Sequence, residues 1–346
     1  MTLDKPKATL QEVARLAAVS LATASRVFNN TAPVSEEVRQ RVLAAASKTG
    51  YQTSVQRSAG LMRQSGIALL IPDILNPYFT EIVRGVQDEA DFNRFLPILL
   101  DTAEDPQLEK QYLRMLVSQP VAGIIVCGSR VASHELIAIH EQVSMPMVVI
   151  NGCLGQPNVA CIIVELEQAT YRAAHHLLDL GHRRIAYLSG PSQSETSRVR
   201  RRGIERALQE AGLNLPEDYC PSSFPNIDGG FQAMSALLAL PSAARPTAVI
   251  AYNDLMALGV LHAARISRVR VPEDFSVVGI DNISMSEHSN PPLTTIAPPK
   301  HRIGRMAMQI LRRMIEGEPP PEESYAYVQC PLIVRESTAQ YHNPNS

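Results

Sequence analysis

The sequence predicts a small all-α head joined to an α/β body of two parallel-sheet subdomains. The first 51 residues carry their apolar residues at helical spacing. From Gly66 onward, short apolar, β-branched runs alternate with amphipathic helical segments, which is typical of parallel sheets covered on both faces. The strand runs fall into two groups, about 66–160 and about 161–290. Two such groups suit two similar halves that face each other across a cleft.

Charge is distributed unevenly along the 346 residues. The formal net charge is −2. Residues 1–64 hold nine Lys or Arg against four Asp or Glu, so the front of the chain carries +5 and the rest carries −7. A basic head on an acidic body suits a phosphate-binding module on a soluble carrier.

The cysteines and the N-terminus indicate the compartment. The five cysteines are Cys127, Cys153, Cys161, Cys220 and Cys330. Their number is odd and none forms a C-x-x-C or metal-ligand spacing, so we expect buried free thiols in a reducing cytoplasm. The start MTLDKPKAT has no apolar signal region, and no run approaches 18 apolar residues. We therefore expect a cytoplasmic protein without a membrane partner.

Residues 9–29 read as two short helices joined by a tight turn. In the first helix Val13, Leu16 and Ala17 share an apolar stripe. Thr9 stands at its N-cap, and Glu12 completes a capping-box pattern. The turn is Ala18-Val19, and Ser20 then caps the second helix.

The second helix has an apolar inner face and a small, polar outer face. The inner face consists of Ala24, Val27 and Phe28. The outer face consists of Ala22, Arg26 and Asn29. A buried seam under such an outer face fits a helix-turn-helix that presents its second helix to a major groove of DNA.

Arg26 is the best candidate for reading a base, because a guanidinium can bond bidentately to guanine. Leu21 and Ala22 lie at the start of the helix, where apolar side chains can contact thymine methyl groups. Short hydroxyl and amide groups suit phosphate oxygens. The phosphate candidates are Thr9, Ser20, Thr23, Ser25 and Asn29. For Thr9 and Ser20 the alternative role is capping alone.

Three domains follow from these patterns. A third helix begins at Ser35 and ends near Gly50, which completes a helix-turn-helix domain at 1–51. Residues 52–65 form a hinge. Residues 66–346 form the α/β body. Its N-subdomain is expected at about 66–160 plus 296–322, and its C-subdomain at about 161–292 plus 323–346.

The body has eight strand and eight helix candidates. The strands are Ile67–Ile71, Leu96–Leu100, Gly123–Cys127, Met147–Ile150, Cys161–Val164, Ile185–Ser189, Ala248–Tyr252 and Ser276–Ile280. The helices are Tyr78–Phe92, Gln107–Ser118, His134–Glu141, Gln168–Leu180, Arg198–Ala211, Gly230–Leu240, Leu255–Ala264 and Arg302–Ile315. The final run 325–336 is expected to supply edge strands to the second half.

The head stretch TLQEVARLAAVSLATASRVFN resembles the DNA-binding head of the lactose repressor/galactose repressor (LacI/GalR) family, whose pattern is close to T-I-x-D-V-A-x-x-A-G-V-S-x-x-T-V-S-R-V-L-N. Twelve positions match, eleven of them identically and Glu12 as an acid in place of aspartate: Thr9, Glu12, Val13, Ala14, Ala17, Val19, Ser20, Thr23, Ser25, Arg26, Val27 and Asn29. Ala18 replaces the turn glycine, Ala24 a valine and Phe28 a leucine. Since glycine tolerates positive φ more readily, Ala18 is expected to alter the turn geometry slightly.

The body also resembles this family, whose body is like a type I periplasmic sugar-binding protein. The motifs are IPDILNPYF (71–79), GHRRIAYLSGP (181–191), RPTAVIAYND (245–254), VPEDFSVVGIDN (271–282) and PPLTTI (291–296). The resemblance implies a hinge helix that orders on the operator, with Leu61 as a wedge in the minor groove. Thr53 and Ser54 depart from the usual Pro-Asn, so a flexible tether is the alternative.

Ligands of parallel α/β sheets bind beyond the C-terminal ends of strands. The side chains expected there are Asp73, Asn76, Tyr78, Phe79, Asn151, Ser192, Asn253, Asp254 and Asp281. Acids, amides and an aromatic wall suit a polyhydroxylated ligand. The resemblance implies effector contacts by Arg200, Asn253 and Asp281, to which Asp73, Tyr78 and Phe79 are added. The alternatives are capping for Asp281 and core packing for the aromatic pair.

The sequence favours a DNA-binding regulator, a repressor, over two other classes. Catalysis has no support, because G-x-S-x-G, H-E-x-x-H and P-loop motifs are missing. No cofactor or metal site is expected. The predicted partners are a palindromic double-stranded operator, a sugar-like effector and a second copy of the chain. The alternatives are a solute-binding transport or sensory protein and a sugar-active enzyme.

Overall fold

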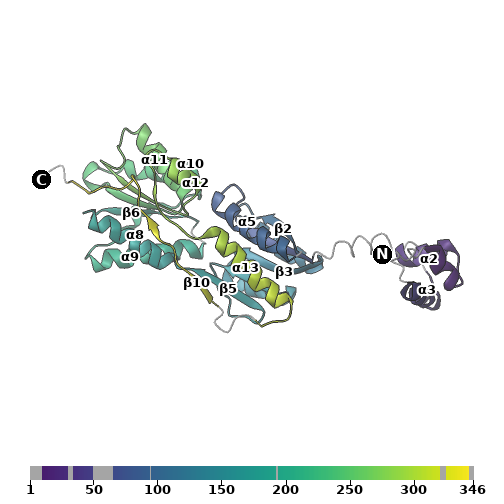
Figure 1. Ribbon diagram of the computed structural model, residues 1–346. Coiled ribbons are helices and arrows are strands. Elements are labelled where there is room, and N and C mark those ends of the chain that lie inside the picture. The colour runs from purple at the N-terminus through teal and green to yellow at the C-terminus, as the bar shows by residue number, and fades with distance from the viewer. Residues whose placement is uncertain are drawn as a thin grey trace, which may run out of the picture. The chain divides into compact units, whose positions relative to one another are not determined.

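The computed structural model of the chain describes residues 10–29, 34–49, 65–93, 95–191, 194–319 and 325–342. The chain divides into two compact units, Met1–Gln64 and Ser65–Ser346 (Figure 1). The predicted hinge up to residue 64, with Leu61, lies outside the described residues, as does Thr9. Within the described part, no helix is long and apolar enough to cross a lipid bilayer.

Three helices form the described part of the head, as predicted. They are α1 (Leu10–Leu16), α2 (Leu21–Asn29) and α3 (Glu36–Thr49). Each turns small apolar side chains inward, and the shared core includes Val13, Ala14, Ala17, Ala24, Val27 and Val42. The prediction that Leu16 is buried is wrong, since it is 50% exposed and Ala14 faces the core instead.

The turn between α1 and α2 keeps a glycine-like conformation although it carries alanine. Ala18 has φ +51°, the left-handed region that glycine adopts more easily. The Val19 N–H donates to the Ala14 carbonyl at 3.0 Å and closes the turn. The Ser20 Oγ accepts from the Thr23 N–H at 3.1 Å, so the predicted cap of α2 is confirmed.

Two sheets form the centre of the second unit. The first has the order β10-β5-β4-β3-β1-β2 and is parallel throughout. Its strands are β1 (Ser65–Ile71), β2 (Phe95–Asp101), β3 (Val121–Cys127), β4 (Met147–Ile150), β5 (Val159–Val164) and β10 (Tyr325–Val328). The second has the order β11-β9-β8-β7-β6, and only β11 runs antiparallel to its neighbour. Its strands are β6 (Ile185–Leu188), β7 (Ala248–Ala251), β8 (Ser276–Ile280), β9 (Thr294–Ile296) and β11 (Leu332–Ile333).

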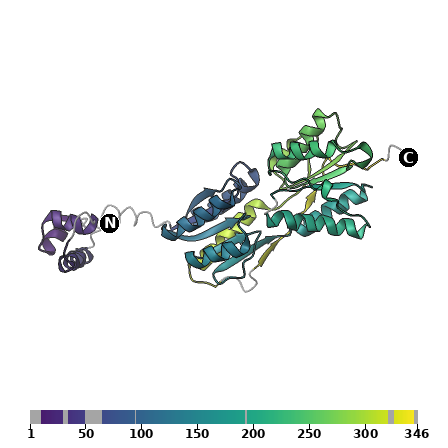
Figure 2. The ribbon, with the colours of Figure 1, turned by 180° about the vertical axis from the view of Figure 1, so that it is seen from behind.

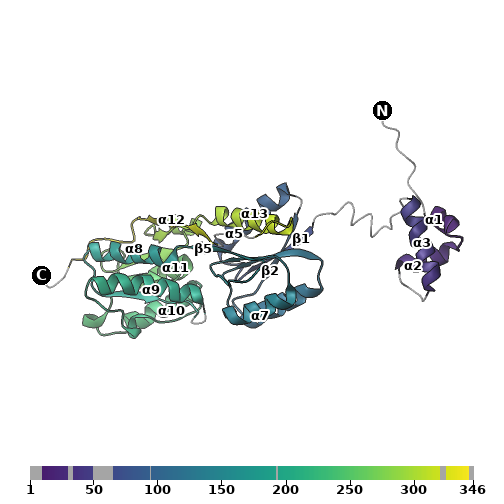
Figure 3. The ribbon, with the colours of Figure 1, turned by 90° about the horizontal axis from the view of Figure 1, so that it is seen from below.

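Helices cover both faces of each sheet (Figures 1 and 3). On the first sheet, α5 (Pro77–Phe92) and α13 (Lys300–Ile315) pack together opposite α6 (Pro106–Met115) and α7 (Ser133–Val143). On the second, α8 (Leu166–Asp179) and α9 (Glu195–Glu210) lie opposite α10 (Ile227–Leu238) and α11 (Asp254–Ile266). The short elements are α12 (Ser284–His288), η1 (Leu116–Ser118), η2 (Glu217–Tyr219) and η3 (Ser242–Ala244). Figure 2 shows the same layers from behind. All eight predicted strands and all eight predicted helices of the body are present, and their bounds differ from the predicted ones by up to three residues.

The chain crosses between the sheets three times, and this corrects the expected subdomain boundaries. β5 pairs with β4 in the first sheet, so this sheet extends to Val164 rather than to residue 160. β10 pairs with β5, so of the run 325–336 only β11 joins the second sheet. β9 pairs with β8, so the second half continues to Ile296. Apolar runs of similar composition do not reveal which sheet they join, because strand pairing is set by distant partners.

Two cysteines depart from the expectation of free thiols. Cys153 and Cys161 form a disulfide with their Cα atoms 5.3 Å apart. It links the loop after β4 to β5. The other three cysteines, Cys127, Cys220 and Cys330, are free. The sequence prediction failed because a spacing of eight residues has no distinctive signature, whereas neighbouring parallel strands bring these two side chains together.

Candidate functional site

The outer side of α2 presents the residues that the sequence predicts to contact DNA. Leu21 is 47% exposed, and Ala22 and Arg26 are exposed as well. The side chains of Thr23 and Ser25 are half-buried beside them. Ala24 and Val27 face the core on the opposite side of the helix. The described part of the head therefore exposes Arg26 on a helix whose other face packs into the core.

The hydroxyl groups at the start of α2 already have local partners. The Ser20 and Thr23 hydroxyl oxygens lie 2.8 Å apart, and Ser20 also caps the helix. A phosphate oxygen would therefore have to join this arrangement rather than meet a free hydroxyl. Asn29 is the last residue of α2, but its side chain lies outside the described part of the structure.

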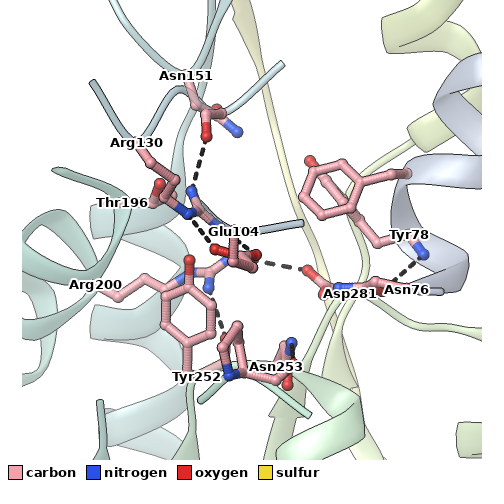
Figure 4. A pocket seen from close by; sticks show the side chains of 13 residues that line it. Asn76, Tyr78, Glu104, Arg130, Asn151, Thr196, Arg200, Tyr252, Asn253 and Asp281 are labelled. Atoms are coloured by element: carbon pink, nitrogen blue, oxygen red, sulfur yellow. Dashed lines mark hydrogen bonds and ion pairs between the residues drawn. The ribbon is translucent and has the colours of Figure 1, made fainter. Parts of the chain in front are cut away.

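A pocket lies between the two halves of the body, where the loops beyond the strands of both sheets converge (Figure 4). It is lined from the first half by Asn76, Tyr78, Phe79, Glu104, Gly128, Arg130 and Asn151. It is lined from the second half by Thr196, Arg200, Pro225, Tyr252, Asn253 and Asp281. All but Arg200 and Pro225 lie in the loop after a strand or in the first turn of the next helix, as expected for parallel sheets. Arg200 lies in the second turn of α9 (Glu195–Glu210).

Arg200 and Asp281 face each other in this pocket without a direct hydrogen bond. The Arg200 Nη2 and Asp281 Oδ1 atoms are 3.7 Å apart, and the two side chains are 6% and 4% exposed. Arg200 donates from Nη1 to the Tyr252 carbonyl at 2.6 Å, and its guanidinium lies 4.2 Å from the centre of the Tyr252 ring. Among the described residues, Arg200 Nε and Asp281 Oδ1 have no hydrogen-bond partner. Buried polar atoms normally have one, so this pair leaves one donor and one acceptor for a ligand.

Asp281 is held in an uncommon backbone conformation. Its φ is +116° and that of Asn282 is +48°, and such residues persist only where their surroundings hold them. Burial raises the pKa of the Asp281 carboxyl to about 8, although Arg200 opposes the shift. Burial likewise raises the pKa of neighbouring Asp254 to about 7. Both carboxyls can therefore carry a proton near neutral pH.

Arg130 and Glu104 form a second, fully bonded pair on the wall from the first half. Arg130 donates from Nη2 to Glu104 Oε1 at 2.8 Å and from Nη1 to the Gly128 carbonyl at 2.7 Å, and its Nε also contacts Glu104. The side chains are 4% and 3% exposed. Bidentate geometry of this kind makes a strong, directional pair.

Aromatic side chains complete the wall. Tyr78 and Phe79 begin α5 and meet edge to face, with ring centres 5.0 Å apart. Asn76 caps this helix by accepting from the Tyr78 N–H at 3.0 Å. Burial raises the pKa of the Tyr78 hydroxyl well above its usual value, so it stays protonated. Both aromatic residues are buried and also line the pocket, so core packing and a ligand-facing role coexist.

Two of the predicted effector residues, Asp73 and Asn253, use their side chains in local hydrogen bonds. Asp73 does not line the pocket, because its carboxylate turns back to accept from the Leu75 N–H at 2.8 Å. Asn253 does line the pocket, but its side chain is used locally. It accepts from the Met256 N–H and donates to the Pro225 carbonyl, at 2.8 and 2.9 Å. The structure thus brings Tyr78, Phe79, Arg200, Asn253 and Asp281 together and leaves Asp73 aside.

The sequence analysis missed several lining residues, namely Glu104, Gly128, Arg130, Thr196, Pro225 and Tyr252. Most of them follow strands that had been predicted, so the same rule about strand ends would have found Arg130 and Tyr252. Glu104 stands three residues beyond β2, in a turn where it and Ala103 have positive φ. Its orientation depends on the distant Arg130, which no local pattern reveals.

The pocket is filled largely by its own side chains. The space left for the centre of a water molecule is about 20 Å³, which is enough for one or two waters. A larger molecule could enter only if side chains moved or the two halves separated. The site is therefore a closed arrangement of paired charges rather than a preformed open cavity.

Comparisons with known proteins match both units of the chain. Residues 9–54 match the model of the bacterial regulatory proteins, lacI family, and residues 174–338 match a periplasmic binding protein-like domain. The HTH-type transcriptional repressor CytR of Escherichia coli (strain K12) is 34% identical over 333 residues, which cover 96% of each chain. The structure of the transcriptional regulator CelR in complex with cellobiose has a TM-score of 0.71 at 30% identity and covers 96% of this chain and 100% of that one. The lac repressor dimer bound to operator and the anti-inducer ONPF has a TM-score of 0.72 at 27% identity, over 96% and 99%.

Proposed function

We propose that this chain represses transcription by binding an operator, because it belongs to the lacI family of bacterial regulatory proteins, a family of DNA-binding transcription repressors. The affinity of the protein for this operator changes when a small effector occupies the pocket between the body halves. The observation that carries the effector site is the pair Arg200 and Asp281. Both are buried there, and each keeps an atom without a hydrogen-bond partner in the described structure. A ligand hydroxyl can accept from Arg200 Nε while donating to Asp281 Oδ1.

The proposed effector is a small polyhydroxylated molecule of the sugar class. The pocket contains arginines and carboxyls in equal number, together with amides and aromatic rings, which favours many hydrogen bonds over one net charge. Tyr78, Phe79 and Tyr252 offer ring faces and edges to the apolar side of a sugar. The cellobiose held by CelR supports this class. Effector contacts are assigned to Tyr78, Phe79, Arg200, Asn253 and Asp281.

The proposed DNA contacts lie on and around α2. Arg26 reads a base, with Leu21 and Ala22 beside it at base edges. Phosphate contacts are assigned to Thr9, Ser20, Thr23, Ser25 and Asn29. Leu61 is proposed as the minor-groove wedge of the hinge. Since operators are chromosomal, we infer a cytoplasmic location for this regulator.

A homodimer is supported by the edge of the first sheet. β2 is the edge strand, and three of its large apolar side chains face solvent: Leu96 at 49%, Ile98 at 41% and Leu99 at 36% exposure. An apolar edge strand is an unfavourable surface for a free monomer. A second copy would cover it and would supply the second recognition helix that a palindromic operator requires.

The DNA test starts from an operator selected by the purified protein from random palindromes. Binding, followed by fluorescence anisotropy, is expected to weaken steeply with salt because phosphate contacts release counterions. Arg26→Ala is expected to lose about tenfold or more in affinity, the value of one bidentate base contact. Arg15→Ala removes a similar exposed charge from α1 and serves as the control. Equal losses in both variants would sink the assignment of Arg26 as a base reader.

The effector test is a thermal-shift panel of sugars, sugar phosphates, sugar acids and nucleobases on the full-length protein. A true effector is expected to raise Tm in the wild type and in Asp73→Ala, whose carboxyl lies outside the pocket. It is expected to lose this effect in Asp281→Ala and Arg200→Ala. A hit that survives both pocket substitutions would show that the effector binds elsewhere.

A further inference from the structure

Lys300 is a buried cation at a junction between the two halves of the body. It is the first residue of α13, just after the chain crosses from β9 in the second sheet to the helix that packs on the first sheet. Its side chain is only 5% exposed. A buried ammonium is unfavourable unless its N–H donors find acceptors, so its partners reveal what it holds together.

Three acceptors surround the Lys300 ammonium, and they come from both halves. Nζ donates to the main-chain carbonyls of Asp281 at 2.7 Å and Asn282 at 2.5 Å, both in the loop after β8. The third partner is Glu81 Oε1 in α5 of the first half, at 3.1 Å. Lysine has three N–H donors. The two loop carbonyls satisfy two of them, and the ion pair with Glu81 persists only while the loop after β8 and helix α5 keep their relative positions.

Both ends of this contact lead directly to the pocket. Asp281 sends its side chain into the pocket from the loop, and the left-handed backbone of Asp281 and Asn282 must be held by neighbours. On the other side, Tyr78 and Phe79 lie one turn before Glu81 on α5 and line the opposite wall. Lys300 therefore stands behind the pocket and touches an element of each wall.

We infer that Lys300 is a positioning residue that couples the pocket to the arrangement of the two body halves. The inference rests on the proposed function and identifies the residue that connects the effector pocket to the movement of the two halves. A ligand that draws on the Asp281 side chain displaces the loop whose carbonyls bind Lys300. The ammonium keeps its ion pair with Glu81 only if α5 follows, so the halves move together. A ligand shifts the equilibrium between two arrangements of the halves only if it binds one of them more tightly. The contact of Lys300 with the loop and with α5 links the position of Asp281 to that arrangement, so ligand affinity differs between the two.

A purely structural anchor is the alternative, and the chain provides a matched control. Arg305 and Glu89 form another ion pair between α13 and α5, with N and O 3.1 Å apart. That pair joins the same two helices but has no contact with the loop at 281–282. Loss of either pair weakens the helix contact, whereas only loss of the Lys300 pair should reach the loop.

The first test measures hydrogen exchange by mass spectrometry on the full-length protein. Glu81→Gln removes the charge from α5 and leaves both carbonyl bonds of Lys300 intact. Amide exchange in residues 281–283, in the other half, is expected to quicken at least fivefold. Arg305→Gln is expected to leave it within twofold. Unchanged exchange in Glu81→Gln would overturn the coupling, and this variant keeps the test valid if Lys300→Met fails to fold.

The second test measures the affinity for the selected operator by anisotropy, without effector. Glu81→Gln and Lys300→Met are expected to change Kd at least fivefold in the same direction, and Arg305→Gln less than twofold. Faster loop exchange with an unchanged Kd would reduce Lys300 to a structural anchor and refute the inference. If the wild type bound no operator at all, the proposed function would fail, while the exchange result would still decide whether the halves are coupled.

Discussion

The two halves of the body place a buried arginine–carboxylate pair on opposite walls of one pocket, and the pairs differ in one respect. Arg130 and Glu104, from the first half, are joined by short hydrogen bonds and are fully partnered. Arg200 and Asp281, from the second half, stand 3.7 Å apart and each keep one atom without a partner. Figure 4 shows both pairs among the side chains that line the pocket. The same chemistry thus serves as a rigid wall on one side and as a receptive surface on the other.

The difference lies in how much each half is fixed by its own contacts. Near the wall of the first half, the Cys153–Cys161 disulfide lies two residues beyond the pocket residue Asn151. The wall of the second half instead depends on a strained loop at Asp281 that Lys300 holds from behind. We expect the first half to respond to substitution through stability and the second through ligand binding.

The largest effect is expected from breaking the bonded pair. Arg130→Ala leaves the Glu104 carboxylate buried without its partner, which costs about 3–5 kcal/mol. For a domain of this size that corresponds to a fall in Tm of roughly 5–10 °C, measured by thermal unfolding. Arg305→Gln should have little effect, because Arg305 is half exposed and Glu89 keeps its hydrogen bond from Gln309. A loss as small as that of the control would show that the first wall is not rigid.

Asp281→Asn is expected to lower effector affinity while leaving stability nearly unchanged, the opposite of Arg130→Ala. Its Oδ1 atom has no partner to lose, so the free energy of unfolding at about pH 4, where the carboxyl is neutral like the amide, should change by less than about 1 kcal/mol. Effector affinity, measured by calorimetry with the ligand found in the panel, should fall by about 100-fold, because a buried polar contact to the ligand is altered. Asp73→Asn is the matched control. Normal affinity in Asp281→Asn would remove the distinction between the pairs.

Reduction of the disulfide should weaken the first half without affecting ligand binding. A closed loop of this length contributes about 2 kcal/mol in the chain-entropy account, so Cys153→Ser should lower Tm by several degrees while effector affinity stays within about twofold. Alkylation of the denatured, unreduced protein should label only the three free cysteines, Cys127, Cys220 and Cys330. Labelling of all five would contradict the disulfide.

The most gradual effect is a dependence of stability on pH, of about 1 kcal/mol for each pH unit. The folded pKa of Asp281 is raised to about 8 by burial, whereas an unfolded aspartate titrates near 4. The folded protein therefore binds an extra proton between these values, so stability from this group is greatest at low pH and is lost as pH rises to about 8.

Urea unfolding should reveal this slope when the wild type is compared with Asp281→Asn from pH 5 to 9. The difference in unfolding free energy should fall by about 1 kcal/mol per pH unit up to pH 8 and then level off. The comparison cancels the parallel contribution of Asp254, whose pKa is also raised by burial. A flat difference would mean that Asp281 is ionised throughout.

Much of this protein can be read from local pattern. Apolar periodicity located the eight predicted strands and the eight predicted helices of the body. Capping chemistry located the start of α2 at Ser20. The rule that ligands bind beyond strand ends led to Tyr78 and Asp281, the family resemblance led to Arg200, and all three line the pocket. These inferences succeeded because helix periodicity, caps and strand ends depend on residues within a few positions of one another.

The sequence by itself determined the class of protein, the helix-turn-helix with Arg26 on its outer face, and the side on which the body carries its pocket. Only the tertiary structure decided which sheet takes β5 and β10, which cysteines pair, and that Asp73 turns away while Arg130 and Glu104 close together. It alone placed Lys300 between Glu81 and the Asp281 loop, residues separated by 200 positions in the chain. Such contacts depend on the positions of distant backbones, and no local pattern records them.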